Sequence, residues 1–127
     1  MRWQIKYYNQ RLEEEILKLP AGLLARYLRL SDLLIEFGSN LGLPHTKKIE
    51  TGLFELRLKG KEGIARVFFC TKIGKRIIML HSFIKKSQKT PKKEIEIARR
   101  RKKEVLENES FRTERESAGK WKGQGCL

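Results

Sequence analysis

Apolar positions follow more than one spacing along the chain, and each change of spacing marks a predicted element. Residues 2–8 mix aromatic and β-branched side chains with polar ones, which is typical of a first strand. The next apolar residues recur at helical spacing up to a Pro-Ala-Gly sequence at residues 20–22, which breaks the pattern. A second, longer helical stripe then ends before Gly38. It consists of Leu23, Tyr27, Leu30, Leu34 and Phe37. We therefore predict a helical hairpin with two unequal arms.

In the middle of the chain, apolar residues recur at every second position. Residues 40–50 are predicted to form a loop. Residues 54–59 alternate apolar and charged side chains, as in a strand with one solvent-facing side. Residues 64–70 are apolar on both faces except for Arg66, which indicates a central strand, and residues 76–84 form the next strand. The connections are short, so we predict an antiparallel meander.

The last predicted helix begins at a Thr-Pro pair, with Thr90 as N-cap and Pro91 in the first helical position. Its apolar stripe is thin, and apolar residues are scarce from Asn108 onward. We predict one domain at residues 1–107 and a disordered tail at residues 108–127. The order of elements is β-α-α-β-β-β-α, which places the chain in the α+β class.

The charge of the chain favours an anionic partner. Twenty-nine Lys and Arg residues against fifteen Asp and Glu residues give a net charge of +14. Such an excess suits nucleic acid, an acidic protein or an anionic membrane surface. Cys70 and Cys126 do not indicate a disulfide framework. No secretory segment or long apolar run occurs, so we expect a cytoplasmic protein without a membrane partner.

Basic residues are densest at the start of the last predicted helix. Two interpretations stay open: a solvated helix face, or a surface that binds a polyanion. The segment from residue 85 to residue 103 contains ten basic residues and only two acidic ones, Glu94 and Glu96. The basic residues are Lys85, Lys86, Lys89, Lys92, Lys93, Arg99, Arg100, Arg101, Lys102 and Lys103.

Arg66 is an unusual residue for an apolar central strand. A buried guanidinium costs free energy unless it reaches solvent or an anion. One interpretation is an ion pair with Glu55 on the neighbouring strand. The other is a phosphate clamp, because the planar guanidinium can bind two phosphate oxygens together. Arg57 and Lys59, on the solvent-facing side of their strand, would complete such a clamp or belong to an ordinary solvated face.

The two histidines differ in what surrounds them. His81 lies in the last predicted strand, close in sequence to Lys85 and Lys86, and is either structural or a neutral general base. His45 lies in a loop and has no evident partner. We find no spacing that suits a metal site, a serine triad or a phosphate-cradling glycine loop. Any enzyme here must therefore act mainly through cations, as in phosphodiester cleavage.

Three stretches of the chain resemble one known family. They are LEEEILKLPAGLLARYLRLSDLLIEFG, GLFELRLKGKEGIARVFF and LHSFIKKSQKTPKKEIEIARRRKKEV, and the resemblance covers about residues 3–106. The family is the RelE/ParE toxin superfamily of type II toxin–antitoxin systems, and the chain is most similar to its HigB-like, phage-associated branch.

This resemblance implies a compact α+β domain with a curved antiparallel sheet. It also implies a ribosome-dependent endoribonuclease, which cuts mRNA in the A site without a metal or other cofactor. In that reaction the ribose 2′-hydroxyl is the nucleophile and a cyclic phosphate is left. Arg57 and Lys59 match the family's basic strand positions, and Arg66 matches the arginine proposed to stabilise the phosphate. His81, Lys85 and Lys86 match the positions of the last-strand catalytic groups.

The resemblance does not identify the groups that transfer protons. RelE has a C-terminal tyrosine near the scissile phosphate, whereas the tyrosines here are Tyr7, Tyr8 and Tyr27. A lysine base would need a pKa lowered from about 10.4, which neighbouring cations promote. We expect Lys85 or His81 in this role. The residues expected to contact RNA are Arg57, Lys59, Lys47, Lys48, Lys89 and Lys92.

The expected partners are mRNA, the ribosome and a cognate antitoxin, which would form a toxin–antitoxin hetero-oligomer with this chain. An acidic antitoxin segment would cover the basic face. One alternative is a non-enzymatic, ParE-like inhibitor of DNA gyrase, because the same fold carries both activities. The other alternative is a module that binds nucleic acid or an antitoxin without catalysis.

Overall fold

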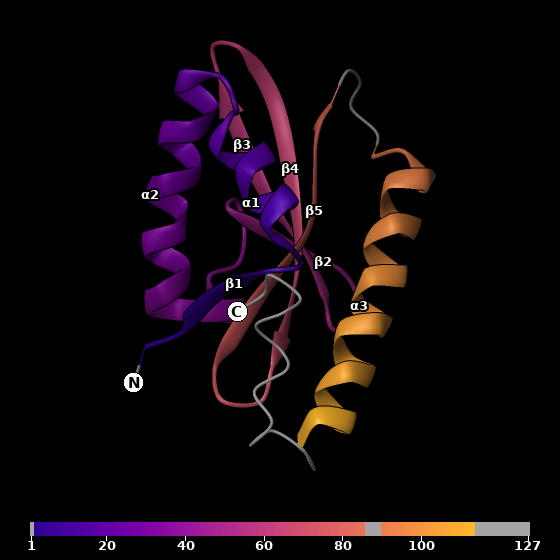
Figure 1. The fold of residues 1–127 in the computed structure, drawn as a ribbon. Coiled ribbons are helices and arrows are strands. Elements are labelled where there is room, and N and C mark those ends of the chain that lie inside the picture. Colours follow the sequence, from indigo (N-terminus) through magenta and orange to yellow (C-terminus); the bar gives the residue numbers. More distant parts are fainter. Residues whose placement is uncertain (1, 86–89, 114–127) are drawn as a thin grey trace.

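The computed structural model describes the backbone of residues 2–85 and 90–113, and the side chains of these ranges as far as residue 108. It contains three α-helices and five strands, which confirms the predicted α+β class (Figure 1). In chain order the elements are β1 (Gln4–Tyr7), α1 (Gln10–Leu17), α2 (Ala21–Phe37), the 3-10 turn η1 (Gly38–Asn40), β2 (Thr46–Glu50), β3 (Leu53–Gly60), β4 (Gly63–Lys72), β5 (Arg76–Lys85) and α3 (Lys92–Thr113).

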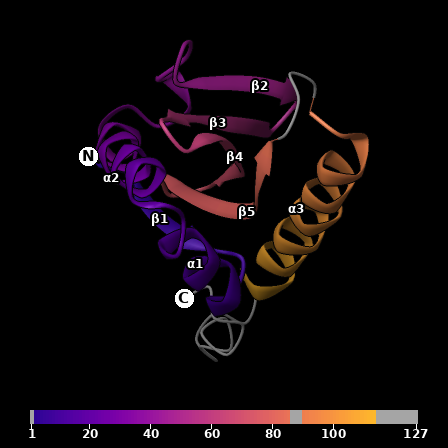
Figure 2. The ribbon, with the colours of Figure 1, turned by 90° about the horizontal axis from the view of Figure 1, so that it is seen from above.

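The five strands form one sheet in the order β1-β5-β4-β3-β2 (Figure 2). Strands β2 to β5 are the predicted antiparallel meander, with one strand more than expected. The prediction of a wholly antiparallel sheet is wrong, because β1 pairs in parallel with β5, Gln4 opposite Arg76. The chain between these two strands includes both N-terminal helices, a crossover long enough for parallel pairing. In this position β1 covers an edge of β5 that would otherwise be unpaired.

Strand β2 corrects the predicted loop at residues 40–50. Thr46 is buried and opposite Leu56, while Lys47 lies opposite Glu55. The sequence does not indicate this strand, because the consecutive polar residues Lys47 and Lys48 interrupt the alternation of apolar and polar positions. Lysines are common on edge strands, where they hinder pairing with other chains.

Helices cover both faces of the sheet. Helices α1 and α2 lie against one face and α3 against the other (Figures 1 and 2). The predicted stripe on α2 is confirmed at its four buried residues, Leu23, Tyr27, Leu30 and Leu34. Phe37 is an exception, with 50% of its surface exposed at the last residue of the helix. Beside it, Gly38 has a positive φ of 59° and packs so closely against Trp3 that an added Cβ would collide with the indole ring.

The start of α3 lies within two residues of the predicted Thr-Pro signal, but the threonine has another role. Pro91 supplies the carbonyl that accepts from the amides of Glu94 and Ile95. The hydroxyl of Thr90 donates to Glu55 Oε1 at 3.1 Å, so the predicted N-cap at Thr90 is corrected to a contact between the loop and β3. The helix continues to Thr113, past the predicted boundary at residue 107. The rest of the predicted tail, residues 114–127, lies outside the described residues. Within the described part of the chain, no helix has both the length and the apolar character needed to span a membrane.

Candidate functional site

The strand register gathers the predicted cations on the face of the sheet that α3 partly covers. Arg57 lies opposite Arg66, and Lys59 lies opposite Ile64, which in turn lies opposite Lys85. Lys47 joins the same face from β2 through its pairing with Glu55. We call Lys47, Arg57, Arg66 and Lys85 the basic cluster.

Glu55 is the buried carboxylate within this cluster. Only 3% of its surface is exposed. Its Oε2 atom lies 3.2 Å from Arg66 Nε and 3.8 Å from Arg57 Nε, and its Oε1 accepts from Thr90. The first interpretation of Arg66, an ion pair with Glu55, is therefore confirmed. The sequence indicates Glu55 only as a partner of Arg66, and its contacts with Arg57 and Thr90 are not predicted.

Arg66 is held from two sides. Only 6% of its surface is exposed, and its Nη1 atom donates to the carbonyl of Ala65 at 3.1 Å. Burial lowers the pKa of Arg66, and the nearby charge of Arg57 lowers it further, while Glu55 opposes both effects. The guanidinium is thus a positioned charge with little freedom to move, which is the arrangement that a phosphate clamp needs.

Lys85 lies at the end of β5 with the arginines close by. Burial lowers the pKa of its ammonium group, and the charges of Arg66, Arg57 and Lys47 lower it further, against the opposing effect of Glu55. The direction is the one expected from the sequence for a lysine that transfers protons.

His81 faces a carboxylate of α3. Its Nε2 atom contacts Glu94 Oε1, both side chains are mostly buried, and the imidazole stacks on Phe83 with the ring centroids 6.0 Å apart. The sequence predicts cations near His81 and does not indicate its contact with Glu94. This contact connects β5 to the first turn of α3.

The other predicted site residues lie around the cluster. Lys59 and Lys92 are exposed, and Lys48 alternates to the opposite face of β2, where it pairs with Phe54. Lys86 and Lys89 lie outside the described residues. In the described ranges, no group of three or more His, Cys, Asp and Glu side chains is arranged to hold a metal ion.

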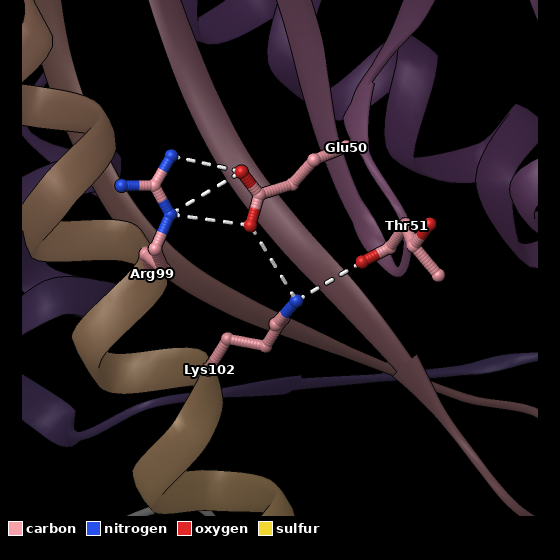
Figure 3. A network of polar contacts seen from close by, with 4 residues as sticks. All are labelled: Glu50, Thr51, Arg99 and Lys102. Carbon is pink, nitrogen blue, oxygen red and sulfur yellow. Dashed lines mark hydrogen bonds and ion pairs between the residues drawn. The ribbon is translucent and has the colours of Figure 1, made fainter.

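Three of the predicted basic residues on α3 attach the helix to the sheet. Arg99 donates to both carboxylate oxygens of Glu50, at 2.8 and 3.2 Å, and Lys102 donates to the carbonyl of Thr51 at 3.0 Å (Figure 3). Hydrogen bonds from Arg99 lower the pKa of Glu50, and that carboxylate raises the pKa of Arg99. Arg101 donates to the carbonyl of Leu80 at 2.8 Å. As far as residue 108, the exposed basic residues of the helix are Lys92, Lys93, Arg99, Arg100 and Lys103.

Where β2 begins, a hollow opens at the edge of the sheet. Its volume is about 320 Å³. It is lined by Arg26, Leu30, Pro44, His45, Arg57, Lys59, Ile64 and Arg66. We call it the edge hollow. The sequence does not indicate Arg26 as a site residue, because only the packing of α2 across the sheet brings it to the hollow. His45 has no partner in the sequence pattern, and it reaches β3 because its carbonyl accepts from the amide of Arg57.

One family model matches this chain. It is described as Phage derived protein Gp49-like (DUF891), and it matches residues 14–103. The matched range includes the basic cluster, Glu55, the edge hollow and the α3 residues Arg99, Arg101 and Lys102 that bind the sheet and the β2–β3 turn. No curated protein matches the sequence.

Proposed function

This chain belongs to the phage-derived Gp49-like family, a RelE-like family of toxins from toxin–antitoxin systems, and we propose that it is a toxin that cleaves translated mRNA on the ribosome. Within the superfamily we assign it to the HigB-like nucleases, with no metal or other cofactor in the reaction. Its place of action would be the cytoplasm, where the ribosomes are.

The observation that carries this proposal is the composition of the basic cluster. Arg57, Arg66 and Lys85 share one face of the sheet, and Glu55 is the buried carboxylate among them. Cleavage of a phosphodiester adds negative charge at phosphorus in the transition state. Cations that are already in position stabilise that charge without reorganisation, which is the most effective form of electrostatic catalysis.

The reaction assigns a role to each of these side chains. The ribose 2′-oxygen attacks phosphorus while its proton passes to a base, the bond from phosphorus to the 5′-oxygen breaks, and that oxygen takes up a proton. We assign charge stabilisation to Arg66, with Arg57 and Lys59 binding phosphate oxygens. We assign proton transfer to Lys85 rather than to His81, because the pKa of Lys85 is lowered and His81 is engaged by Glu94.

The family implies an antitoxin as partner. We propose that an acidic antitoxin segment binds over the basic cluster and thereby blocks access of mRNA. Charge complementarity of this kind mainly raises the association rate and is weakened by salt.

The proposal is tested by inducing the chain in cells without antitoxin and mapping mRNA 5′ ends. Arg66→Ala is a poor test variant, because it leaves Glu55 buried with one partner fewer and can unfold the domain. Arg66→Lys keeps the charge and removes the planar fork. We expect wild-type cuts confined to translated regions, and a loss of about 100-fold or more with Arg66→Lys. The matched control is Arg29→Lys on the exposed side of α2, which should cut like wild type.

Two results would contradict the proposal. Growth arrest with intact mRNA and with DNA breaks would indicate a gyrase inhibitor. No arrest by the folded wild-type chain would indicate a module that only binds its partner.

A further inference from the structure

The edge hollow differs in charge from a second, larger hollow in the described part of the chain. Its lining includes the permanent cations Arg26, Arg57, Lys59 and Arg66, and no carboxylate. The second hollow, of about 560 Å³, has Arg2, Asp32 and Glu36 in its lining, and Arg2 pairs with Glu36 at 3.6 Å. The charged residues that line the second hollow thus sum to −1. The four cations that line the edge hollow are offset only in part, by Glu55, which contacts Arg57 and Arg66 from outside the lining. The remaining positive charge favours an anionic occupant.

The edge hollow is continuous with the basic cluster. Arg57 and Arg66 belong to both, so a phosphate bound by these arginines would lie beside the hollow. A ligand in the hollow would therefore either belong to the same molecule as that phosphate or compete with the phosphate for the two arginines. A polynucleotide satisfies the first condition.

The walls of the hollow are held by hydrogen bonds before any ligand arrives. The amide of Gly22, in the first turn of α2, donates to Glu62 Oε2 in the β3–β4 turn at 2.9 Å. The amide of Arg57 donates to the carbonyl of His45 at 2.8 Å. The first bond fixes α2 relative to β3, and the second fixes the loop before β2. Binding in such a preformed site costs little ordering free energy.

The lining combines the contacts that a nucleotide uses. The cations suit a phosphate, the apolar surfaces of Leu30, Pro44 and Ile64 suit a sugar or a base edge, and the His45 ring can stack on a base. The volume lies at the small end of the range for ligand pockets, about 300–1,000 Å³, so one nucleotide fits better than a duplex.

We propose that the edge hollow is a subsite for one nucleotide of single-stranded RNA next to the scissile phosphate, with Arg26 binding the phosphate of that nucleotide. The inference rests on the proposed nuclease function and extends it from the sheet face to α2. Arg26 is exposed and makes no ion pair or hydrogen bond with the described part of the chain, so its charge is available to a ligand.

The test measures binding of a cleavage-resistant RNA trinucleotide with a 5′-phosphate to the full-length protein. Wild type is compared with Arg26→Ala and with Arg29→Ala, which removes the same charge from the same helix outside the hollow. Each internal phosphate of the ligand is replaced in turn by an uncharged methylphosphonate, and the 5′-phosphate is replaced by a hydroxyl group. We expect Arg26→Ala to weaken binding about fivefold to tenfold and Arg29→Ala less than twofold. With one particular phosphate neutralised, Arg26→Ala should have no further effect.

The outcomes separate the subsite from the proposed function. Equal losses in the two variants, a loss coupled to no single phosphate, or no binding of the trinucleotide by wild type would overturn the subsite, whatever the mRNA maps show. Intact mRNA in cells would overturn the nuclease. It would leave the subsite supported if the coupling between Arg26 and one phosphate is measured.

Discussion

Glu55 has two opposite effects on the arginines around it. Its carboxylate offsets the cost of burying Arg66, which would otherwise be a guanidinium with little access to solvent. The same carboxylate competes with any phosphate for that guanidinium. An incoming phosphate must therefore draw Arg66 partly away from Glu55 or share it, and the second is possible because a guanidinium has five N–H donors. Glu55 thus positions Arg66 and also reduces its attraction for weakly charged ligands.

Lys85 is the residue at which the proposed function and stability oppose each other. Its pKa is lowered in the folded protein, so the charged form is less favourable there than in the unfolded chain. Below the folded pKa this costs stability. The cost disappears as the pH rises through the folded pKa toward the unfolded value of about 10.4. We expect Lys85→Met to raise the melting temperature at pH 7, to lose that advantage above about pH 10, and to abolish mRNA cleavage.

The control for Lys85→Met is Lys93→Met, on an exposed position of α3. The melting temperature of Lys93→Met should equal that of wild type at every pH in this range. A Lys85→Met protein that is less stable than wild type at neutral pH would show that Lys85 is a structural residue.

At the scale of elements, the alternation of apolar and charged residues predicts which side chains share a face of a strand. It does not predict which strand lies beside it. The period of two placed Arg57 with Lys59 and identified β4 as central, and the register confirms both. It could not show β2, whose lysines suit an exposed edge, or the parallel position of β1, which depends on a crossover of two helices. Arg26 was missed for a related reason. The position of a helical residue over a sheet depends on where the helix crosses it.

Helix α3 illustrates the same limit with charges. Ten clustered cations in the sequence indicate a polyanion surface, yet Arg99, Arg101 and Lys102 bind groups of the sheet and of the β2–β3 turn. The apolar contribution of the helix is small, with Ala98 and Val105 as its buried residues in the described part. Cations near acceptors on the sheet compensate for this thin apolar stripe, and sequence spacing alone does not show which cations do so.

The contact between Glu50 and Arg99 should therefore have a pH-dependent effect on stability. The pKa of Glu50 is lowered by the hydrogen bonds from Arg99, so its contribution is present above the ordinary glutamate pKa of about 4.3 and is lost as the pH falls through the lowered value. We expect Glu50→Gln to lower the melting temperature at pH 7 and to have little effect near pH 3. Thermal unfolding at a series of pH values checks this, with Glu107→Gln on the exposed side of α3 as the control. An effect that stays constant down to pH 3 would show that the carboxylate charge does not hold the helix.

At the scale of the whole molecule, the net charge of +14 acts through cations that make no ion pair or hydrogen bond within the described part of the chain. Lys92, Lys93 and Lys103 are exposed on α3, beside the face that carries the basic cluster. We expect the triple change of these lysines to Gln to leave the melting temperature unchanged and to weaken binding to ribosomes. If all three contact phosphates, the magnitude of the slope of log K against log salt concentration should fall by about 2 to 3, since each contact contributes about 0.7 to 0.9. The matched control changes Arg11 on α1, Lys18 at the C-cap of α1 and Arg29 on α2 to Gln, which removes the same charge from the other side of the sheet. Equal slopes in the two triple variants would mean that binding to the ribosome depends on total charge alone. This result would contradict the prediction that the α3 side of the sheet is the binding face.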